Sequence, residues 1–183
     1  MLVKLSAAIF VSASSFLATV SAAAPQHEDA FTRGQDYSAI AQRVRQALLL
    51  LPNYGVFDDL AFRVDGTTIT LLGAVVQVKL KSDAEIAAKH VEGATHVVNE
   101  IEVLPASDED DAIRAAAFRA IYQEGPLAPR YSHRAVASIH IIVKNKDVRL
   151  EGVVDNQADR DLAGARANVK NAYKVTNDLT IAR

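Results

Sequence analysis

The chain of 183 residues contains no cysteine, and this absence excludes several classes of protein. Without thiols there is no disulfide framework, no thiolate zinc site, no cysteine nucleophile and no cysteine for lipid attachment at a processed N-terminus. After residue 24 no apolar run reaches the roughly 20 residues that a membrane-spanning helix needs. We therefore expect a protein that is stabilised by its packed core alone.

Patterns for metal binding and catalysis are missing as well. The carboxylates stand as neighbours in Asp58-Asp59 and in residues 108–111, which is typical of solvated charge runs, and the second run favours a helix N-terminus. No phosphate-binding loop or nucleophile motif is present. We place His90 on the solvent side of a helix and His140 on a strand face directed away from the core. The histidines do not show the spacing of metal ligands: His27, His90, His96, His133 and His140. We therefore predict no enzymatic activity, no metal and no cofactor.

The N-terminal segment has the composition of a targeting sequence. Lys4 is the only charge before Glu28, an apolar and small-residue run extends from Leu5 to Val20, and residues 21–24 are Ser-Ala-Ala-Ala. A membrane anchor is the alternative, but the apolar run is shorter than the roughly 20 residues that span a bilayer. We predict a cleaved signal peptide over residues 1–23 and a mobile leader over residues 24–37.

Charge is divided unevenly along the chain, although the net charge is only −2. Residues 24–111 carry 7 Lys and Arg against 15 Asp and Glu, whereas residues 112–183 carry 12 against 7. Such an asymmetry bears on partners and not on the fold. The basic second half is expected to contact something acidic, and the acidic first half of the same chain is one candidate.

Two stretches, residues 68–75 and 147–154, share one pattern of alternating apolar and polar residues with a glycine. This period of two is that of a half-buried strand. Gly73 and Gly152 occupy inward positions, where the missing side chain lets another backbone come close. The residues expected to line the core are Ile69, Leu71 and Val75 in the first stretch and Val148, Leu150 and Val154 in the second.

The same order of elements surrounds both stretches. The first unit has a helix from Ser38 to Pro52, strands at 60–64, 68–75 and 97–103, a turn at Asp65-Gly66 and a helix capped by Ser82 or Asp83. The second has a helix that ends before Gly125, strands at 139–143, 148–154 and 175–181, a turn at Asn145-Lys146 and a helix after Asp159. The last strands of the two units match position for position, so that Ile181 corresponds to Val103. Asn99 and Asn177, which recur there, are expected to hydrogen-bond backbone and not to bind a ligand.

We therefore predict an α+β protein of two tandem αββαβ units, residues 38–104 and 108–183, with a linker at residues 105–107. Each unit is expected to form a three-stranded mixed sheet with two helices on one face. Leu72, Val98 and Ile142 are expected to point away from the helices.

The repeated motifs resemble those of a known family. Residues 97–103 (Val-Val-Asn-Glu-Ile-Glu-Val), residues 139–145 (Ile-His-Ile-Ile-Val-Lys-Asn) and the Val-x-Leu-x-Gly-x-Val strands are similar to the BON domain, named for bacterial osmotically inducible and nodulation proteins. The likeness covers about residues 38–183. It implies a periplasmic envelope protein associated with stress tolerance and outer-membrane integrity, which binds anionic phospholipid through its second unit. Lys146 departs from the glycine that is common in the family, and this concerns only the geometry of the turn.

The first helices of the two units differ in a way that bears on lipid binding. Phe118 and Tyr122 stand where the first unit has Arg45 and Leu49. Aromatic side chains beside arginine suit a lipid headgroup interface, whereas the alternative is that they fill the junction between the units. The candidate lipid-binding residues are Arg114, Phe118, Arg119, Tyr122, Arg130, Tyr131 and Arg134.

The resulting functional hypothesis is a non-enzymatic envelope protein whose second unit binds an anionic phospholipid surface and which supports envelope integrity under osmotic stress. Envelope proteins are further candidate partners, while export argues against nucleic acid. The alternative is a periplasmic protein-binding or chaperone-like module that uses exposed sheet faces.

Overall fold

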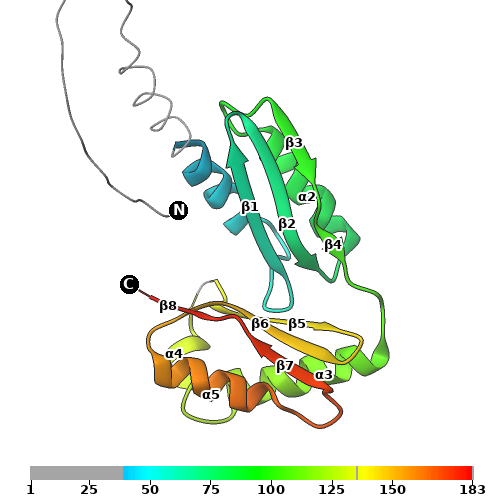
Figure 1. The fold of residues 1–183 in the computed structure, drawn as a ribbon, viewed down its shortest axis with the longest axis vertical. Helices are drawn as coiled ribbons and strands as arrows, with labels where there is room; N and C mark the ends of the chain where they lie inside the picture. Colours follow the sequence, from blue (N-terminus) through cyan, green and yellow to red (C-terminus); the bar gives the residue numbers. More distant parts are fainter. Residues whose placement is uncertain (1–38, 135, 183) are drawn as a thin grey trace, which may run out of the picture.

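The computed structural model describes residues 39–134 and 136–182, which fold into two units of one kind (Figure 1). The predicted signal peptide and leader lie outside the described residues. In Figure 1 the first unit lies above the second, and the loop that follows the first helix reaches down to the second sheet. This loop becomes central to the candidate site.

The first unit begins with a helix over residues 39–49 and has a mixed sheet, as predicted. Its central strand pairs antiparallel with the strand before it and parallel with the strand segments after it. The elements are β1 (Asp59–Asp65), β2 (Thr68–Val75), α2 (Val78–Lys89), β3 (His96–Asn99) and β4 (Glu102–Val103), with β2 at the centre.

The second unit repeats this arrangement, with β6 as its central strand. Its first helix ends in a π-helical turn, and a short helix is added before the first strand. The elements are α3 (Asp108–Phe118), η1 (Arg119–Gln123), α4 (Ala128–Tyr131), β5 (Ile139–Lys144), β6 (Asp147–Val154), α5 (Gln157–Ala167), β7 (Lys174–Asn177) and β8 (Thr180–Ile181). The prediction of two tandem αββαβ units is confirmed.

Each unit has its own hydrophobic core between the sheet and the helices. Val44 of the first helix and Ala84 of α2 are fully buried, as is Ala163 of α5. The predicted inward positions of the central strands are all buried: Ile69, Leu71 and Val75 in β2, and Val148, Leu150 and Val154 in β6. The alternation in the sequence therefore gave the correct face of both strands.

The glycines of the central strands allow the neighbouring strand to approach closely. A Cβ on Gly73 would lie 2.2 Å from the carbonyl oxygen of Asp59, and a Cβ on Gly152 would lie 2.3 Å from that of Ser138. Both glycines also have a positive φ, 110° and 119°, which L side chains rarely adopt. The prediction that another backbone comes close at these positions is confirmed.

The repeated asparagines join a helix to the last strand in each unit. The side-chain amide of Asn99 donates to the carbonyl of Lys81 in α2 at 3.0 Å, and that of Asn177 donates to Arg160 in α5 at 2.7 Å. The Asn99 side-chain oxygen also accepts from the amide of Ile101 at 3.2 Å. The backbone-binding role is confirmed. Because this local bond turns the chain, the continuous strand predicted over 97–103 is interrupted between β3 and β4.

The first hairpin turn lies one residue later than predicted. Asp65 pairs with Thr68, so the two turn residues are Gly66 and Thr67. Gly66 has a φ of 61° and takes the first central position, which requires a positive φ in the turns that suit hairpins. The assignment of Asp65 to the turn was therefore wrong.

The second hairpin turn is Asn145-Lys146, as predicted, and both residues have a positive φ. The carboxylate of Asp110 accepts hydrogen bonds from their backbone amides, at 2.9 Å from Asn145 and 2.8 Å from Lys146. This carboxylate stabilises a turn in which lysine replaces the usual glycine. Asp110 is therefore buried, and its expected place in a solvated charge run was wrong.

Helix α2 begins earlier than the capping residues suggested. Gln77 is its N-cap, without a side-chain hydrogen bond, and the helix starts at Val78. Ser82 and Asp83 lie in the second turn, where Asp83 forms an ion pair with Lys79. The helix was predicted correctly but its start was not, because side-chain capping is only one way in which a helix can begin.

The units contact each other through a small apolar cluster of Ala74, Leu104 and Ile142. Ile142 does point away from its own helices, but the first unit covers it, so its expected exposure was wrong. Glu102 and Lys144 form an ion pair at 2.5 Å across the junction. Val98 remains exposed, as predicted.

The C-terminal strand also deviates from the repeat. Ile181 was expected to face inward like Val103, but it is exposed. Only Ala182 follows it among the described residues, so no later segment of the described chain covers β8. Leu179, two residues earlier, is buried like its equivalent Ile101 in the first unit.

A candidate binding cleft between the two units

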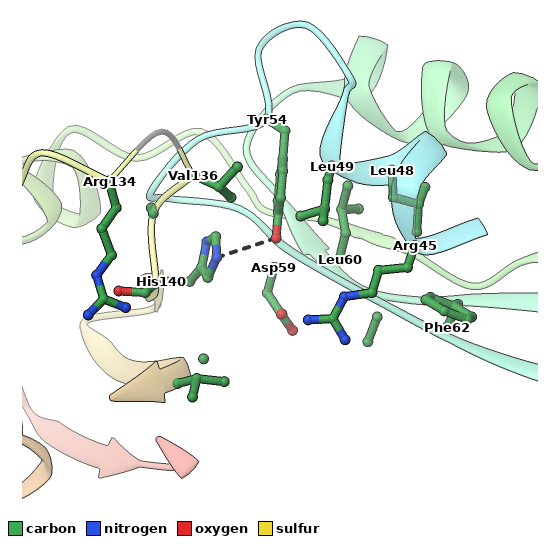
Figure 2. Close-up of a pocket in the computed structure, with 15 residues that line it drawn as sticks. Arg45, Leu48, Leu49, Tyr54, Asp59, Leu60, Phe62, Arg134, Val136 and His140 are labelled. Atoms are coloured by element: carbon green, nitrogen blue, oxygen red, sulfur yellow. Dashed lines mark hydrogen bonds between the residues drawn. The ribbon is translucent and has the colours of Figure 1, made fainter. Parts of the chain in front are cut away.

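A cleft of about 480 Å³ lies where the two units meet. One wall comes from the first helix and β1, and the other from the loop before β5 and the end of β6 (Figure 2). Its apolar lining comprises Leu48, Leu49, Leu60, Phe62, Val136 and Val153. Of these, Leu49, Val136 and Val153 are exposed, so the cleft presents apolar surface to ligands.

Charged side chains stand at the ends of the cleft. Figure 2 shows Arg45 at one end and Arg134 at the other, with the carboxylate of Asp59 between them. Burial raises the pKa of Asp59, and the nearby side chains of His140 and Arg149 oppose this shift. The cleft thus combines an apolar lining with charges of both signs at fixed positions.

Tyr54 and His140 close the inner part of the cleft. Their rings stack at 5.3 Å, and the Tyr54 hydroxyl lies 3.4 Å from Nε2 of His140. The other ring nitrogen of His140 lies 3.2 Å from the carbonyl oxygen of Gly55. Burial, with a contribution from Asp59, raises the pKa of Tyr54 to about 12. His140 faces away from its own core as expected, but the first unit covers this face, so the side chain is buried.

Asp58 holds the loop that carries Tyr54. Its carboxylate accepts from the amides of Val76 at 2.9 Å and Gly55 at 3.1 Å. The side chain is buried, and burial raises its pKa while these amides oppose the shift. The expectation that Asp58 belongs to a solvated charge run was wrong, because the carboxylate serves as a loop anchor.

Every outward-facing residue of the β5 edge has a hydrogen-bond partner. The Tyr122 hydroxyl donates to the carbonyl of Ile139 at 2.6 Å and accepts from its amide at 3.0 Å. The amide of Ile141 donates to the carbonyl of Val56 at 2.7 Å, and Val143 accepts from Nη2 of Arg114 at 2.6 Å. Since every alternate residue of the strand has a partner, this edge is closed to further chains.

Arg114 and Tyr122 of the predicted lipid-binding set therefore lie inside the protein. Asp111 also pairs with Arg114. Phe118 is half-buried, with its ring 5.3 Å from Tyr122 and 6.0 Å from Phe57 of the first unit. The structure thus places these aromatics at the junction, the alternative weighed from the sequence, and their expected exposure was wrong.

Three further candidates form a local network at the start of α5. Tyr131 is buried and donates to Asp159 at 2.7 Å, and the same carboxylate group pairs with Arg130. Arg134 lies 4.6 Å from the Tyr131 ring centre and pairs with Asp155 at 2.9 Å. The positive charges of Arg130 and Arg134 thus have carboxylate partners within the unit.

Arg119 is the candidate that the structure leaves most available. It is exposed on η1, and it forms no ion pair within residues 39–134 and 136–182. The predicted lipid-binding residues therefore do not form one surface. Arg119 is exposed and has no ion pair among the described residues, whereas the other members are buried, half-buried or paired with carboxylates.

Sequence reasoning missed the cleft itself. Its residues come from segments about 80 positions apart, and no single motif brings them together. One signal was present, namely the replacement of Phe118 and Tyr122 by Arg45 and Leu49 in the first unit. From the sequence alone, we connect that difference with lipid binding by the second unit. In the structure its effect lies in the first unit, where the smaller Leu49 and the non-aromatic Arg45 border the cleft.

The described residues offer little for metal chemistry or membrane spanning. Between residues 39 and 182, leaving out residue 135, no group of three His, Asp or Glu side chains is placed to hold a metal ion. In the same part of the chain, none of the helices has both the length and the apolarity required to cross a bilayer.

Comparison with known proteins agrees with the repeated architecture. The BON domain matches twice, over residues 36–105 and 110–183. The chain belongs to the BON domain family. This tandem BON protein is also 31% identical over 147 residues to osmotically-inducible protein Y of Escherichia coli strain K12, covering 79% of this chain and 72% of the relative.

Among solved structures, two from the type III secretion system of Chlamydia trachomatis are similar to parts of this BON protein. The structural protein CdsD is 11% identical, with 79% of this chain and 93% of that chain covered and a TM-score of 0.29. Its C-terminal domain is 12% identical, with coverage of 80% and 96% and a TM-score of 0.25. Scores this low do not establish a shared overall fold.

Proposed function

We propose that this BON protein is a non-enzymatic, exported envelope protein that binds polypeptide in the cleft between its two units. Relatedness to osmotically-inducible protein Y supports a role under osmotic stress. The apolar N-terminal run followed by small residues supports export and a periplasmic location. Residues suited to binding are present, whereas no catalytic constellation was recognised in the sequence.

The observation that carries this proposal is the apolar lining of the cleft. Leu49, Val136 and Val153 are exposed there. Apolar surface with a few fixed polar groups is typical of a binding site. Arg45, which pairs with no carboxylate among the described residues, favours a ligand that combines apolar and acidic side chains.

A client-aggregation assay tests this proposal. The full chain at increasing ratios is expected to delay aggregation of a reduced, unfolded test protein, and Val136→Glu is expected to weaken the effect because it places a charge in the apolar lining. Val78→Glu is the matched control, since Val78 is exposed on α2 and lies outside the cleft. Equal activity of both variants would exclude the cleft as the binding site.

Binding of anionic phospholipid by the second unit is a second candidate. It is favoured by the excess of basic residues in residues 112–183, and by Arg119, which stands exposed without a carboxylate partner among the described residues. Each basic side chain near an anionic surface contributes about 1 kcal/mol. Arg114, Tyr122 and Tyr131 are buried, so they stabilise the second unit and do not contact the lipid.

Vesicle flotation tests the lipid proposal. The full chain is expected to float with vesicles rich in phosphatidylglycerol and not with phosphatidylcholine vesicles, and salt should weaken the binding. Arg119→Glu should reduce flotation, whereas Arg43→Glu in the first unit should not. A chain that ignores anionic vesicles at low salt has no such function.

A further inference from the structure

The two units differ in what covers the outer edge of their first strand. In β5 every outward-facing residue has a hydrogen-bond partner, from Tyr122, Val56 and Arg114. The unpaired edge of a strand is a template for another chain, and proteins usually block it. The second unit follows this rule.

Among the described residues, the equivalent edge of β1 is open at Phe62 and Val64. A Cβ on Gly73 would lie 2.2 Å from the oxygen of Asp59 and 3.4 Å from the nitrogen of Ala61, so these backbone groups face β2. The alternate residues, including Phe62 and Val64, therefore direct their amides and carbonyls outward. In the described part of the chain no hydrogen bond reaches these outward groups of Phe62 and Val64.

The difference follows from the first helix of each unit. Leu49 stands where the second unit has Tyr122, and Ala41 stands where it has Arg114. Neither replacement has a polar group that can reach the strand edge. The Tyr54 hydroxyl lies against the amide of Leu60. Its contact ends there, so it does not cover the edge at Phe62 and Val64.

The second unit shows that backbone from another part of the chain can bond to such an edge. In the second unit, the groove between the first helix and β5 holds residues 55–57 of the first unit, which form a turn closed by the hydrogen bond from the amide of Asp58 to the carbonyl of Gly55 at 3.3 Å. The carbonyl of Val56 accepts from the strand at 2.7 Å, and the ring of Phe57 packs on Phe118. In the first unit the corresponding space, beside Arg45 and Leu49, is the cleft.

We propose that the outer edge of β1 binds an extended segment of a partner polypeptide, which adds to the first sheet as a further strand. This inference rests on the proposed function, because it specifies how the cleft holds a polypeptide. Backbone hydrogen bonds to Phe62 and Val64 provide the affinity, and alternate side chains enter the apolar lining. Arg45, which replaces the aromatic Phe118, favours an acidic side chain next to the apolar ones.

Backbone methylation of a peptide tests strand addition. The probe is a fluorescent peptide of about ten residues, a usual upper length for a strand, in which Phe and Val alternate with Glu and Thr. Two variants carry N-methyl groups either on the Phe and Val positions or on the Glu and Thr positions. Only alternate amides of an added strand face its neighbour, so one variant should bind about tenfold more weakly or worse and the other should bind like the parent.

A transplanted block provides the second test. Leu49→Tyr places in the first unit the hydroxyl that closes the edge in the second unit, and we expect loss of peptide binding with an unchanged thermal midpoint. Leu50→Tyr is the matched control, because Leu50 is exposed and does not line the cleft. Leu49→Tyr protein that binds the peptide as tightly as the unaltered chain would overturn the inference.

The outcomes separate this inference from the proposed function. If the parent peptide binds and both methylated peptides bind equally well, strand addition is wrong but the cleft still binds polypeptide. If no peptide binds and client aggregation is unaffected, both are wrong. Sedimentation that shows self-association lost in Leu49→Tyr would assign the edge to a second copy of this chain and overturn the choice of a foreign partner.

Discussion

The hydroxyl of Tyr122 bonds to both backbone groups of Ile139, donating to the carbonyl at 2.6 Å and accepting from the amide at 3.0 Å. One side chain therefore closes the start of the β5 edge and fixes the first helix of the second unit against its sheet. In this BON protein the residue at the corresponding position, Leu49, has no such group. Among the described residues, this difference is one of those that separate the closed edge of β5 from the open edge of β1, together with the replacement of Arg114 by Ala41.

Tyr122→Phe is expected to lower the free energy of unfolding by about 1–3 kcal/mol, because two buried backbone groups lose their partner. Chemical denaturation of the full chain measures this change. The ring remains, so packing against Phe118 should be kept. Tyr173→Phe, at an exposed tyrosine, provides the control. A change as small as that of the control would mean that the hydroxyl bonds carry no net stability.

Alkaline pH is expected to destabilise the fold through Tyr122 and Tyr54. Burial raises the pKa of each to about 12, above the ordinary value of 10.0. The folded state thus holds these protons more tightly than the unfolded state, so their stabilising effect is complete below pH 10 and is lost as pH rises toward 12. Unfolding followed by circular dichroism should show falling stability across this interval. The Tyr54→Phe/Tyr122→Phe variant should show a smaller slope, and an equal slope would contradict the assignment.

Leu71→Ala and Leu150→Ala should each lower the free energy of unfolding by about 2–5 kcal/mol, the range for large-to-small substitutions in a core. Both side chains are fully buried at matching positions of the central strands. Thermal melts measure the effect, with Val98→Ala as the exposed control. Losses below about 1 kcal/mol at both positions would show that the assigned strand register is wrong.

Ile142→Glu is expected to uncouple the two units. The side chain packs against Ala74 and Leu104 across the junction, and a buried, unpaired carboxylate there is unfavourable. The Glu102–Lys144 ion pair is half-exposed and stabilises the contact by less than about 1 kcal/mol, so it cannot maintain the junction alone. Calorimetry should resolve two transitions in the variant. Val98→Glu, on the exposed face of the first sheet, should keep the melting profile of the unaltered chain.

Local patterns in the sequence were sufficient for the strands and their faces. The two-residue period placed Leu71 and Leu150 in the cores, and the glycine in each repeat marked the approach of a neighbouring strand. Helix and turn boundaries were less well determined. Val78 and Thr67 have no distinctive chemistry, and the start of α2 and the position of the first turn depend on pairing across the sheet.

The candidate site depended on contacts between distant residues. Arg114, Tyr122 and Tyr131 have the composition of a surface patch, but each has a partner in another element that removes it from the surface. His140 and Ile142 face away from their own core, as the alternation predicted, and are buried only because the first unit covers them. The sequence of β5 alone contains no information about which other part of the protein packs on its outward face.

The sequence by itself determined that this chain is a tandem repeat of two αββαβ units, because strand alternation and inward glycines are local properties. The tertiary structure alone decided which repeat is closed and which is open. Residues 55–57 fill the groove of the second unit, whereas the groove beside Leu49 holds no equivalent segment of the described chain. That asymmetry arises from how one unit docks on the other, and docking depends on surfaces that form only after both units have folded.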